Sequence, residues 1–505
     1  MENTLVKLLH DSVQKFPEKN AIIHADRNLS YINLWKKSCG VAQFLTRQGL
    51  TSGDRISLLI ENSIEYVIAY YAVLMAGGAV VGLNTAAKSR DLINWIQHSE
   101  SHFLFTSSTH PELDDVLKGL DTNICQLVFL DPCSLSEEFT CWDDIEPCDA
   151  IPDNKISDPA NQLASIIYTS GTTGKPKGVM LSHTNLYENT ISILTYLKLN
   201  ETDSIVNVLP FYYSYGNSVL HIHIAVGGTL ILENSLLYPH KVVALMSETK
   251  ATGFSGVPST FNLLLNRIKF SDFDLSSLRY MTQAGGHMVP SYVKKIKNEL
   301  PEIKFVIMYG QTEASARLSY LPAEDIEVKL GSIGRAIPGV ELEVMDESLN
   351  PVAPNVTGEI YARGKNIMMG YWKDPDTTQS VLHDNWLKTG DLAYKDEDNY
   401  LYIVGRSSEM IKSGAHRISP KDIEEVILEY NSVEEASVVG VEDKLLGQVI
   451  KAVIVIKPEH EVTKMELLRY CKANLANYKI PKFIEFVDEI PKTASGKVRR
   501  FMLQN

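Results

Sequence analysis

Apolar runs of strand length alternate with amphipathic helical patterns over most of the chain, and this alternation constrains the fold more than any other feature. Such runs lie at Ile56–Ile60, Leu127–Leu130, Ser204–Leu209 and Lys304–Met308. Strands separated by helices build parallel sheets covered by helices, because a parallel connection needs a long crossover. The sequence therefore predicts layered α/β structure for the larger part of the molecule.

Beyond about residue 331 the pattern changes. Val340–Met345 and Gly358–Arg363 alternate apolar and polar residues, which is typical of strands with one buried face. A compact tail follows Tyr400–Val404, with helical patterns at 420–430 and 464–476 and strand-like runs at 436–441, 450–456 and 483–487. The change predicts a β-rich subdomain followed by a separate α+β unit.

The length of 505 residues is too great for one ordinary core, whereas about 100 residues suffice for a small domain. We therefore predict an α/β protein with a large N-terminal domain of residues 1–405 and a small C-terminal domain of residues 409–505. The two are expected to meet at a hinge formed by residues 406–408.

Composition narrows the class of protein. The net charge of −14 argues against a nucleic-acid partner, because nucleic-acid binding needs a basic surface. The stretch from Tyr66 to Ala87 has no charged residue and could cross a bilayer, but two adjacent glycines interrupt it, so a helix followed by a strand is expected.

His221 and His223 lie in an apolar stretch and are interpreted as structural residues rather than metal ligands. The six cysteines form no CxxC pair and the start lacks the order of a signal peptide, which indicates a reduced, cytoplasmic protein without a transmembrane segment. The oligomeric state is left open between a monomer and a homodimer.

A glycine-rich loop follows the strand-like run Leu163–Tyr168. Its backbone can approach an anion closely, and its hydroxyls and lysines add hydrogen-bond donors and positive charge. The candidate phosphate-binding residues are Thr169, Ser170, Gly171, Thr172, Thr173, Gly174, Lys175 and Lys177. The loop is not a Walker A motif, because Gly171 and Gly174 are too close together and Pro176 blocks the helix that should follow Lys175. The alternative is a surface loop, but a linker rarely carries three hydroxyls and two lysines directly after an apolar strand.

This loop resembles the phosphate loop of the adenylate-forming superfamily, which includes acyl-CoA synthetases, luciferase and the adenylation domains of nonribosomal peptide synthetases. Further motifs that resemble the same family follow in the same order as far as Lys497, so the resemblance covers nearly the whole chain. It implies an enzyme that uses ATP and Mg²⁺, with a mobile C-terminal domain that carries a catalytic lysine.

The motif Met308–Glu313 places a hydroxyl and a carboxylate after a strand, where oxygen ligands can hold Mg²⁺ beside phosphates. The resemblance implies that Thr312 contacts the α-phosphate and that Glu313 binds Mg²⁺, both as catalytic residues. It also implies that Gly285 and Gly286 lie along the adenine ring and that Tyr309, Gly310 and Gln311 contact the nucleotide.

Asp391 follows a glycine and could be an ordinary turn residue, but a carboxylate can accept both hydroxyl protons of a ribose. The resemblance assigns Asp391 and Arg406 to the ribose. It brings Lys412 and Arg417 to the nucleotide, and it places Gly414 and Ala415 along the path of a pantetheine arm. The usual Asp or Lys of the family's hinge is replaced here by Ser408.

Near the end of the chain, Pro491–Lys497 reads on its own as a basic surface loop. It resembles the last motif of the family, which implies that Lys497 is the catalytic lysine. Lys497 would bridge the substrate carboxylate and the α-phosphate while these react, and pyrophosphate would be released. The C-terminal domain would then rotate and present the Gly414 face to a nucleophile.

The acyl substrate is indicated by Tyr213, Ser214 and Tyr215, which resemble the gate and wall of the family's acyl pocket. Relatives that activate amino acids carry Asp where Ser214 stands, so a free α-amino acid is disfavoured and a fatty or other hydrophobic acid is expected. No carrier-protein segment is seen after Lys497, so the acceptor is expected to be coenzyme A, then the phosphopantetheine of an acyl carrier protein, then an amine. A luciferase-like monooxygenase and a non-catalytic ATP-binding regulator are alternatives of other classes.

Overall fold

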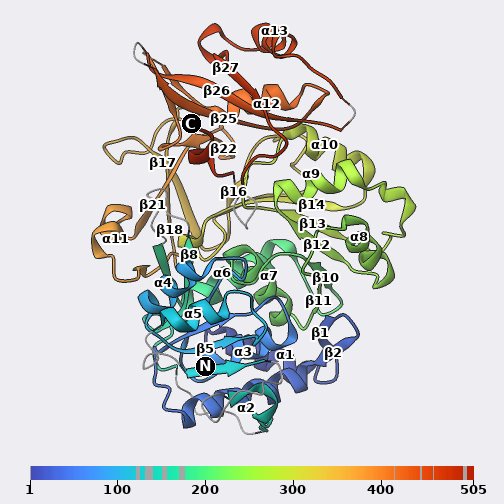
Figure 1. The fold of residues 1–505 in the computed structure, drawn as a ribbon, viewed down its shortest axis with the longest axis vertical. Coiled ribbons are helices and arrows are strands. Elements are labelled where there is room, and N and C mark those ends of the chain that lie inside the picture. The colour runs from blue at the N-terminus through green and yellow to red at the C-terminus, as the bar shows by residue number, and fades with distance from the viewer. Residues whose placement is uncertain are drawn as a thin grey trace.

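The computed structural model describes residues 2–120, 126–130, 140–149, 156–169, 177–414, 416–443, 446–458, 460–492 and 498–504. Within these residues the strands form four sheets (Figure 1). Two large sheets with helices between and around them make up most of the molecule, and two smaller sheets follow in the chain. The predicted α/β class is confirmed.

The first large sheet has nine strands in the order β16-β15-β14-β13-β12-β10-β11-β1-β2. Its strands are β1 Asn20–His24, β2 Arg27–Ser30, β10 Ser204–Asn207, β11 Thr229–Leu232, β12 Gly253–Gly256, β13 Tyr280–Gln283, β14 Lys304–Tyr309, β15 Ser319–Leu321 and β16 Arg335–Ala336. From β1 through β11, β10, β12 and β13 to β14 the pairing is parallel. The carboxyl ends of β12, β13 and β14 therefore meet at one edge, where open α/β sheets bind ligands.

The second large sheet has eight strands in the order β19-β9-β8-β4-β3-β5-β6-β7. Its strands are β3 Arg55–Leu59, β4 Ala79–Gly82, β5 Ser101–Thr106, β6 Gln126–Phe129, β7 Thr140–Cys141, β8 Leu163–Thr169, β9 Lys177–Ser182 and β19 Gly370–Tyr371. β8 and β9 pair antiparallel, with Thr169 opposite Lys177. This hairpin brings the two ends of the predicted phosphate loop together.

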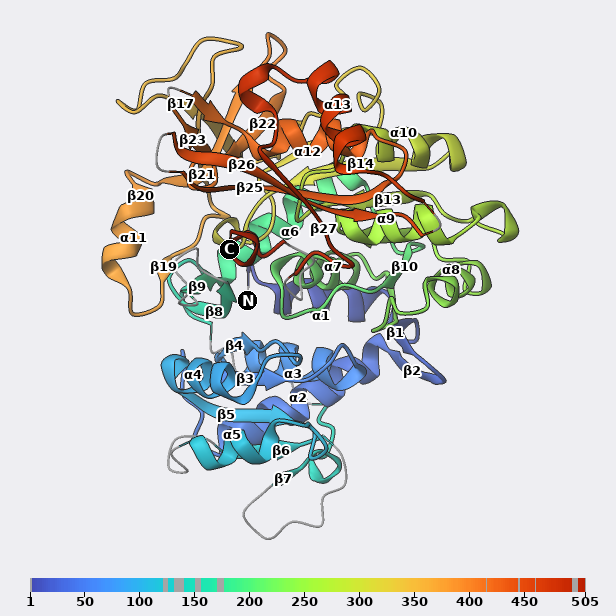
Figure 2. The same ribbon diagram turned by 45° about the horizontal axis from the view of Figure 1, so that its top comes forward.

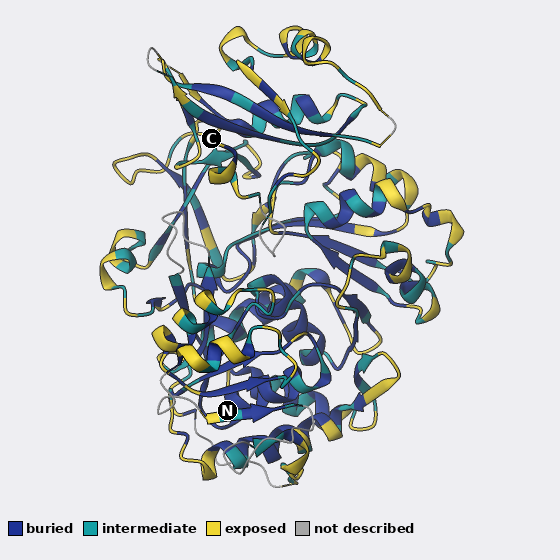
Figure 3. Cartoon of the chain, viewed as in Figure 1, coloured by how far each residue is buried: buried dark blue, intermediate teal, exposed yellow. Residues whose placement is uncertain are grey.

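The helices of the large domain are α1 Leu5–Lys15, α2 Tyr31–Arg47, α3 Ile64–Met75, α4 Ser89–Ser99, α5 Leu113–Gly119, α6 His183–Leu197, α7 Ser214–Ala225, α8 Pro239–Glu248, α9 Pro258–Arg267 and α10 Pro290–Glu299, with short 3-10 turns η1 Trp142–Asp144, η2 Phe270–Asp272 and η3 Thr312–Ala314. Helix α3 is buried along almost its whole length, and β4 follows it after the two glycines (Figure 3). The uncharged stretch is thus an interior helix and a strand, as predicted. No helix in the described part of the chain is long and apolar enough to cross a membrane.

One hydrophobic core joins the two large sheets, since it contains Ile22 and Ile205 from the first and Ile56 and Val80 from the second. Two polar side chains inside it are satisfied locally. His221 Nε2 lies 2.8 Å from the Tyr70 hydroxyl, and His223 Nε2 lies 2.8 Å from that of Tyr280. Burial lowers the pKa of His221 to about 3 and that of His223 to about 4, so both rings are neutral. These contacts support their interpretation as structural residues.

The third sheet is β-rich and antiparallel, in the order β17-β18-β21-β20 with β22 beside β21. Its elements are β17 Val340–Met345, β18 Gly358–Gly364, α11 Pro375–Val381, β20 Leu382–His383, β21 Trp386–Lys395 and β22 Leu401–Arg406. The fourth sheet has the order β24-β23-β26-β25 with β27 beside β26. Its elements are β23 Ile411–Ser413, β24 His416–Ile418, α12 Pro420–Leu428, β25 Val433–Asp443, β26 Gly447–Ile456, α13 Lys464–Asn474, η4 Asn477–Lys479, β27 Phe483–Phe486 and η5 Arg500–Leu503.

The fourth sheet and its helices form the top of the molecule in Figures 1 and 2 and have a hydrophobic core of their own. The last strand of the third sheet ends at Arg406 and the first of the fourth begins at Ile411. The change of sheet therefore falls close to the predicted hinge at 406–408, and the domain limits stay a prediction.

Candidate active site

The stem of the predicted phosphate loop is fixed by packing on both sides. The ring of Tyr168 stacks on Trp95, with centroids 5.8 Å apart, and its hydroxyl lies 2.8 Å from His98 Nδ1. On the other strand, Lys177 Nζ lies 5.1 Å from the centre of the Tyr371 ring. The predicted contacts of Ser170, Gly171, Thr172, Thr173, Gly174 and Lys175 lie outside the described residues.

The carboxylate of Glu313 is held beside this hairpin by a residue that the sequence did not single out. Glu313 lies in η3, which begins three residues after the end of β14, and its Oε1 accepts a hydrogen bond of 2.8 Å from the hydroxyl of Tyr371. Tyr371 belongs to β19, which pairs with β9. Burial and the negative charge of Glu313 raise the pKa of Tyr371, so the tyrosine stays a neutral donor. A glycine-tyrosine pair in the sequence carries no sign of such a contact.

The turn after β14 explains why glycine stands at position 310. A Cβ there would lie 2.1 Å from the carbonyl oxygen of Ala316 and 2.7 Å from Cα of Arg317. The chain turns back sharply at Ser315 and Ala316, which both have positive φ. The close approach fixes Thr312 and Glu313 at the edge of the sheet.

Asp391 is the most connected carboxylate of the site. It is 4% exposed, and its Oδ2 accepts a hydrogen bond of 2.7 Å from the hydroxyl of Tyr309. Its Oδ1 lies 3.0 Å from Nε of Arg406, which stands directly opposite in the pairing of β21 with β22. Asp391 raises the pKa of Arg406, and burial together with Asp391 raises that of Tyr309 well above its ordinary value. Three residues predicted to bind one nucleotide, from three different strands, therefore meet at one point.

The predicted adenine segment lies at the neighbouring strand ends. β13 ends at Gln283, whose side-chain amide donates a hydrogen bond of 2.8 Å to the carbonyl of Gly286. Gly285 has φ +86, and both glycines are exposed. An accessible backbone is therefore available beside β14, and Gln311 lies next to Thr312 on that strand's loop.

The predicted acyl residues lie at the start of α7, directly against the β14 loop. Ser214 Oγ is 3.3 Å from Thr312 Oγ1, so the acyl and phosphate motifs touch. Tyr215 is buried and its hydroxyl donates to the carbonyl of Thr282, at 2.9 Å. Tyr213 precedes the helix, and burial raises its pKa to about 12, while the positive charge of Arg499 acts in the opposite direction.

The C-terminal domain brings some of the predicted residues towards this site and not others. Lys412 and Arg417 face each other across the β23–β24 hairpin and are exposed, and the described structure records no hydrogen bond from their side chains to the N-terminal domain. Gly414, at the tip with φ +57, is also exposed. Ala415 and Lys497 lie outside the described residues. Val498, which follows the predicted lysine loop, pairs with Lys492, and the positive charge of Arg499 opposes the rise in the pKa of Tyr213.

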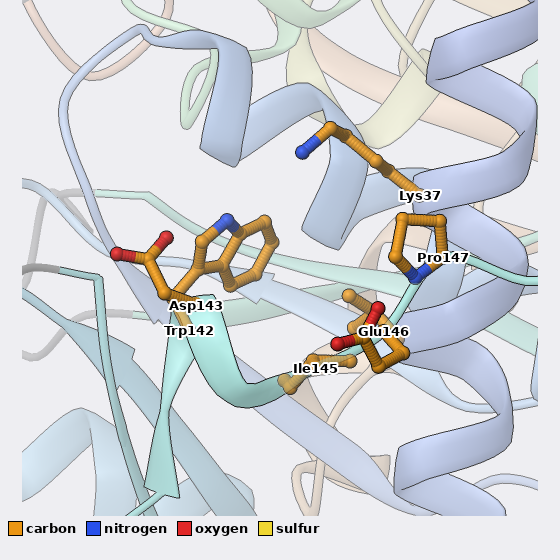
Figure 4. A pocket seen from close by; sticks show the side chains of 7 residues that line it. Lys37, Trp142, Asp143, Ile145, Glu146 and Pro147 are labelled. Atoms are coloured by element: carbon orange, nitrogen blue, oxygen red, sulfur yellow. The ribbon is translucent and has the colours of Figure 1, made fainter.

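A cavity of about 100 Å³ lies elsewhere, between α2 and the turn η1 (Figure 4). It is lined by Lys37, Val41, Trp142, Asp143, Ile145, Glu146 and Pro147. None of these side chains belongs to the motifs described above, so the cavity has no part in the site.

Comparison with known proteins agrees with this geometry. The family model for AMP-binding enzymes matches residues 9–372, and the model for the C-terminal domain of AMP-binding enzymes matches residues 422–497. The chain belongs to the AMP-binding enzyme family. A long-chain-fatty-acid–CoA ligase of Bacillus subtilis is 31% identical to it over 528 residues, which cover 98% of this chain and 93% of the relative. A 2-succinylbenzoate–CoA ligase of Bacillus licheniformis is 32% identical over 488 residues, which cover 96% and 97%.

Among solved structures, the anthranilate CoA ligase AuaEII in complex with anthranoyl-AMP superimposes with a TM-score of 0.91 at 25% identity, over 99% of this chain and 96% of that one. The expected relationship to adenylate-forming enzymes is confirmed. This family member is an AMP-forming ligase of the acyl-CoA synthetase type. Such ligases form an acyl adenylate from ATP and typically use Mg²⁺ and coenzyme A.

Proposed function

We propose that this AMP-binding enzyme converts a carboxylic acid into its acyl adenylate and then transfers the acyl group to the thiol of coenzyme A. The observation that carries the proposal is the contact between Ser214 and Thr312, 3.3 Å apart, beside the Tyr309–Asp391–Arg406 cluster. It sets a candidate acyl site directly against a candidate nucleotide site.

The nucleotide would lie along the carboxyl ends of β13 and β14. Asp391 would accept the ribose hydroxyls, with Arg406 and Tyr309 holding its carboxylate in place. Gly285 and Gly286 would lie along the adenine, and Gly310 and Gln311 would contribute further contacts. Thr312 would donate to the α-phosphate, while Thr169, Lys177 and the loop between them would hold the outer phosphates.

Glu313 fits a magnesium ligand. A carboxylate oxygen is the donor that Mg²⁺ prefers, and Tyr371 occupies only Oε1 with a hydrogen bond. When bound, Mg²⁺ supplies positive charge that stabilises the phosphate oxygens. The role of the protein is to hold Glu313 rigid, which the contact with Tyr371 supports.

In the first half-reaction a carboxylate oxygen forms a bond to the α-phosphorus, and the bond from that phosphorus to the bridging oxygen of pyrophosphate breaks. Both reactants are negative, so positive groups and hydroxyl donors dominate the stabilisation. Lys497 would contribute an ammonium between the carboxylate and the α-phosphate. The effect of the Arg499 charge on the pKa of Tyr213 supports an approach of this loop from the acyl side.

In the second half-reaction a thiolate attacks the acyl carbon and AMP leaves with the bonding electrons. The hinge at 406–408 would allow the C-terminal domain to rotate, withdraw Lys497 and turn Gly414, Ala415, Lys412 and Arg417 towards the site. In this structure the Gly414 hairpin is exposed and is not turned towards the site. This supports an assignment of the observed domain arrangement to the first half-reaction.

The acid is proposed to carry no free α-ammonium group. Ser214 supplies a hydroxyl where a carboxylate would be needed to neutralise a buried ammonium. One relative named above is a long-chain-fatty-acid–CoA ligase, which is in line with the expectation of a fatty or other hydrophobic acid. The other is a 2-succinylbenzoate–CoA ligase, and 2-succinylbenzoate carries a second carboxylate on an aromatic body. Coenzyme A is the first candidate acceptor, ahead of a carrier protein or an amine.

The test measures the two half-reactions of Lys497→Ala separately. We expect pyrophosphate exchange to fall at least 100-fold, while thioester formation from chemically prepared acyl adenylate is largely kept. Lys492→Ala is the matched control, because this lysine precedes the same loop but pairs with Glu435 at 2.5 Å. Equal loss of both half-reactions in Lys497→Ala would show that the lysine does not serve adenylation alone. Absence of pyrophosphate exchange by the unmodified enzyme with every acid of a broad panel would refute the proposed function.

A further inference from the structure

A buried arginine lies beside the candidate acyl residues and takes no part in the reaction outlined above. Arg317 is 3% exposed and lies between α7 and β14. Its guanidinium carbon lies 4.2 Å from the centre of the Tyr215 ring. A guanidinium is always charged in a protein, so this is a cation enclosed in the interior.

The hydrogen bonds of Arg317 go to neutral acceptors. Nε donates to Sδ of Met308 at 3.3 Å, one terminal nitrogen to the carbonyl of Ala316 at 3.1 Å, and the other to Oγ of Ser218 at 3.3 Å. No carboxylate of the described residues lies within 4 Å of it as an ion-pair partner. The guanidinium also forms a hydrogen bond with the hydroxyl of Tyr196, which is a neutral group as well.

A buried cation without a counter-ion is unfavourable unless something else compensates for it. A half-buried arginine in the same domain shows the usual solution, since Arg279 donates to both carboxylate oxygens of the buried Asp203, at 3.2 and 2.5 Å. Arg317 has the ring of Tyr215 and neutral hydrogen-bond partners instead. The described residues therefore supply no anionic partner to this charge.

The position of Arg317 along α7 relates it to the proposed reaction point. Ser214 touches Thr312 at the start of the helix, and Ser218, which accepts from Arg317, lies four residues further on. At 1.5 Å per residue, this places the guanidinium contact roughly 6 Å along the helix from Ser214. A substrate whose carboxylate reacts at Thr312 and whose body follows α7 would bring its far end to Arg317.

We propose that Arg317 is a specificity-determining residue that binds a second anionic group of the acyl substrate, so that the acid activated by this enzyme is a dicarboxylic acid or a comparably substituted one. This inference rests on the proposed function and refines it. The expected acid keeps a largely apolar body between its two ends, packed on Tyr215, and one of the two carboxylates reacts while the other pairs with the guanidinium. A fork of two parallel hydrogen bonds to a carboxylate suits arginine better than lysine.

The test compares acids that differ only in the second charge. Pyrophosphate exchange is measured with hexanedioate against hexanoate, and with benzene-1,4-dicarboxylate against benzoate, for the unmodified enzyme and for Arg317→Met and Arg317→Lys. We expect the unmodified enzyme to prefer the dicarboxylate of at least one pair by 10-fold or more in kcat/KM. Arg317→Met should abolish or invert that ratio, and Arg317→Lys should keep part of it.

Preference for both monocarboxylates by the unmodified enzyme would overturn the inference and leave the proposed function intact. An equal fall for both members of each pair in Arg317→Met would also overturn it, because that is the result of a purely structural role. No exchange with any acid would instead refute the proposed function. Where Arg317→Met does not fold, thermal stabilisation of the unmodified enzyme by hexanedioate over hexanoate decides the question, and equal effects would overturn the inference.

Discussion

Replacing Asp391 with asparagine keeps the size of this side chain and removes its charge. In the structure the carboxylate accepts one hydrogen bond from Tyr309 and one from Arg406. An asparagine can accept only one of them, because its second terminal atom is itself a donor. The buried hydroxyl of Tyr309 and the guanidinium of Arg406 then compete for one oxygen.

The cost follows from these two contacts. A hydrogen bond to a charged group contributes ~1.5–3 kcal/mol, and a neutral one ~0.5–1.5 kcal/mol. If one hydrogen bond is weakened and the other is lost, the protein is destabilised by about 2–3 kcal/mol. The contact with Arg406 is counted at the lower end of its range because that side chain is 40% exposed. Two ribose hydroxyls that donate to the same carboxylate would be affected too, so AMP affinity should fall about 10- to 100-fold.

The free energy of unfolding is measured by urea titration and AMP affinity by isothermal titration calorimetry. Glu341→Gln is the matched control, because Glu341 pairs with Arg363 at 2.5 Å in the same sheet but both side chains are exposed. Such a pair contributes about 0–1 kcal/mol, so the control should keep its stability and its AMP affinity. If Asp391→Asn lost no more stability than Glu341→Gln, the contacts with Tyr309 and Arg406 would not contribute as reasoned. If it lost stability but bound AMP normally, Asp391 would not bind the ribose.

Further expectations concern the support of Glu313 and two buried groups of the core. Tyr371→Phe removes the donor to Glu313 and should weaken the apparent Mg²⁺ affinity in pyrophosphate exchange by about 5- to 10-fold, or on the order of 1 kcal/mol; an unchanged Mg²⁺ dependence would contradict the positioning role. Burial opposes ionisation of Asp203, but hydrogen bonds from Arg279 and its neighbours outweigh it and lower the pKa below 3.8. Ionised Asp203 therefore adds to the free energy of unfolding above pH 3.8, and this stabilisation is lost as the pH falls through the lower pKa of the folded state. Asp203→Asn should lower the free energy of unfolding, measured by urea titration, by about 2–3 kcal/mol at pH 7 and by progressively less in acid. Burial lowers the pKa of His183 from 6.5 to about 4, so the unfolded chain alone takes up this proton between those values and stability falls by up to about 1.4 kcal/mol per pH unit. His183→Leu should lose less stability than the unmodified protein between pH 7 and pH 5, and equal losses would show that this histidine is protonated in the fold.

The sequence was informative wherever one segment carried its own physical signal. The apolar run Lys304–Met308 became β14, and the uncharged stretch from Tyr66 to Ala87 contains most of α3 and all of β4, because adjacent glycines end the helix. The order of motifs was enough to predict an adenylate-forming enzyme. Asp391 and Arg406 were assigned to the same group of the nucleotide, and the strand pairing places them directly opposite one another.

Contacts between distant segments could not be read from the sequence. Tyr371 reaches Glu313 across 58 positions because β19 pairs with the far strand of a hairpin, and no local pattern encodes that pairing. Arg317 reads as one more charged residue after the β14 motif. Its burial depends on the turn at Ser315 and Ala316 and on the polar face of α7, which only the folded chain brings together.

Arg406 occupies two places at once, as the last residue of β22 and the first of the proposed hinge. Its side chain is tied to Asp391, and the next amide, that of Ser407, donates to the carbonyl of Gly390 at 2.9 Å. The proposed hinge is therefore held at Arg406 and Ser407 by contacts with the N-terminal domain. A rotation of the C-terminal domain would have to begin at the exposed Ser408. Because Arg406 belongs to both the proposed hinge and the proposed ribose site, the orientation of the C-terminal domain and the affinity for AMP would be linked: if AMP favours one orientation, that orientation binds AMP more tightly.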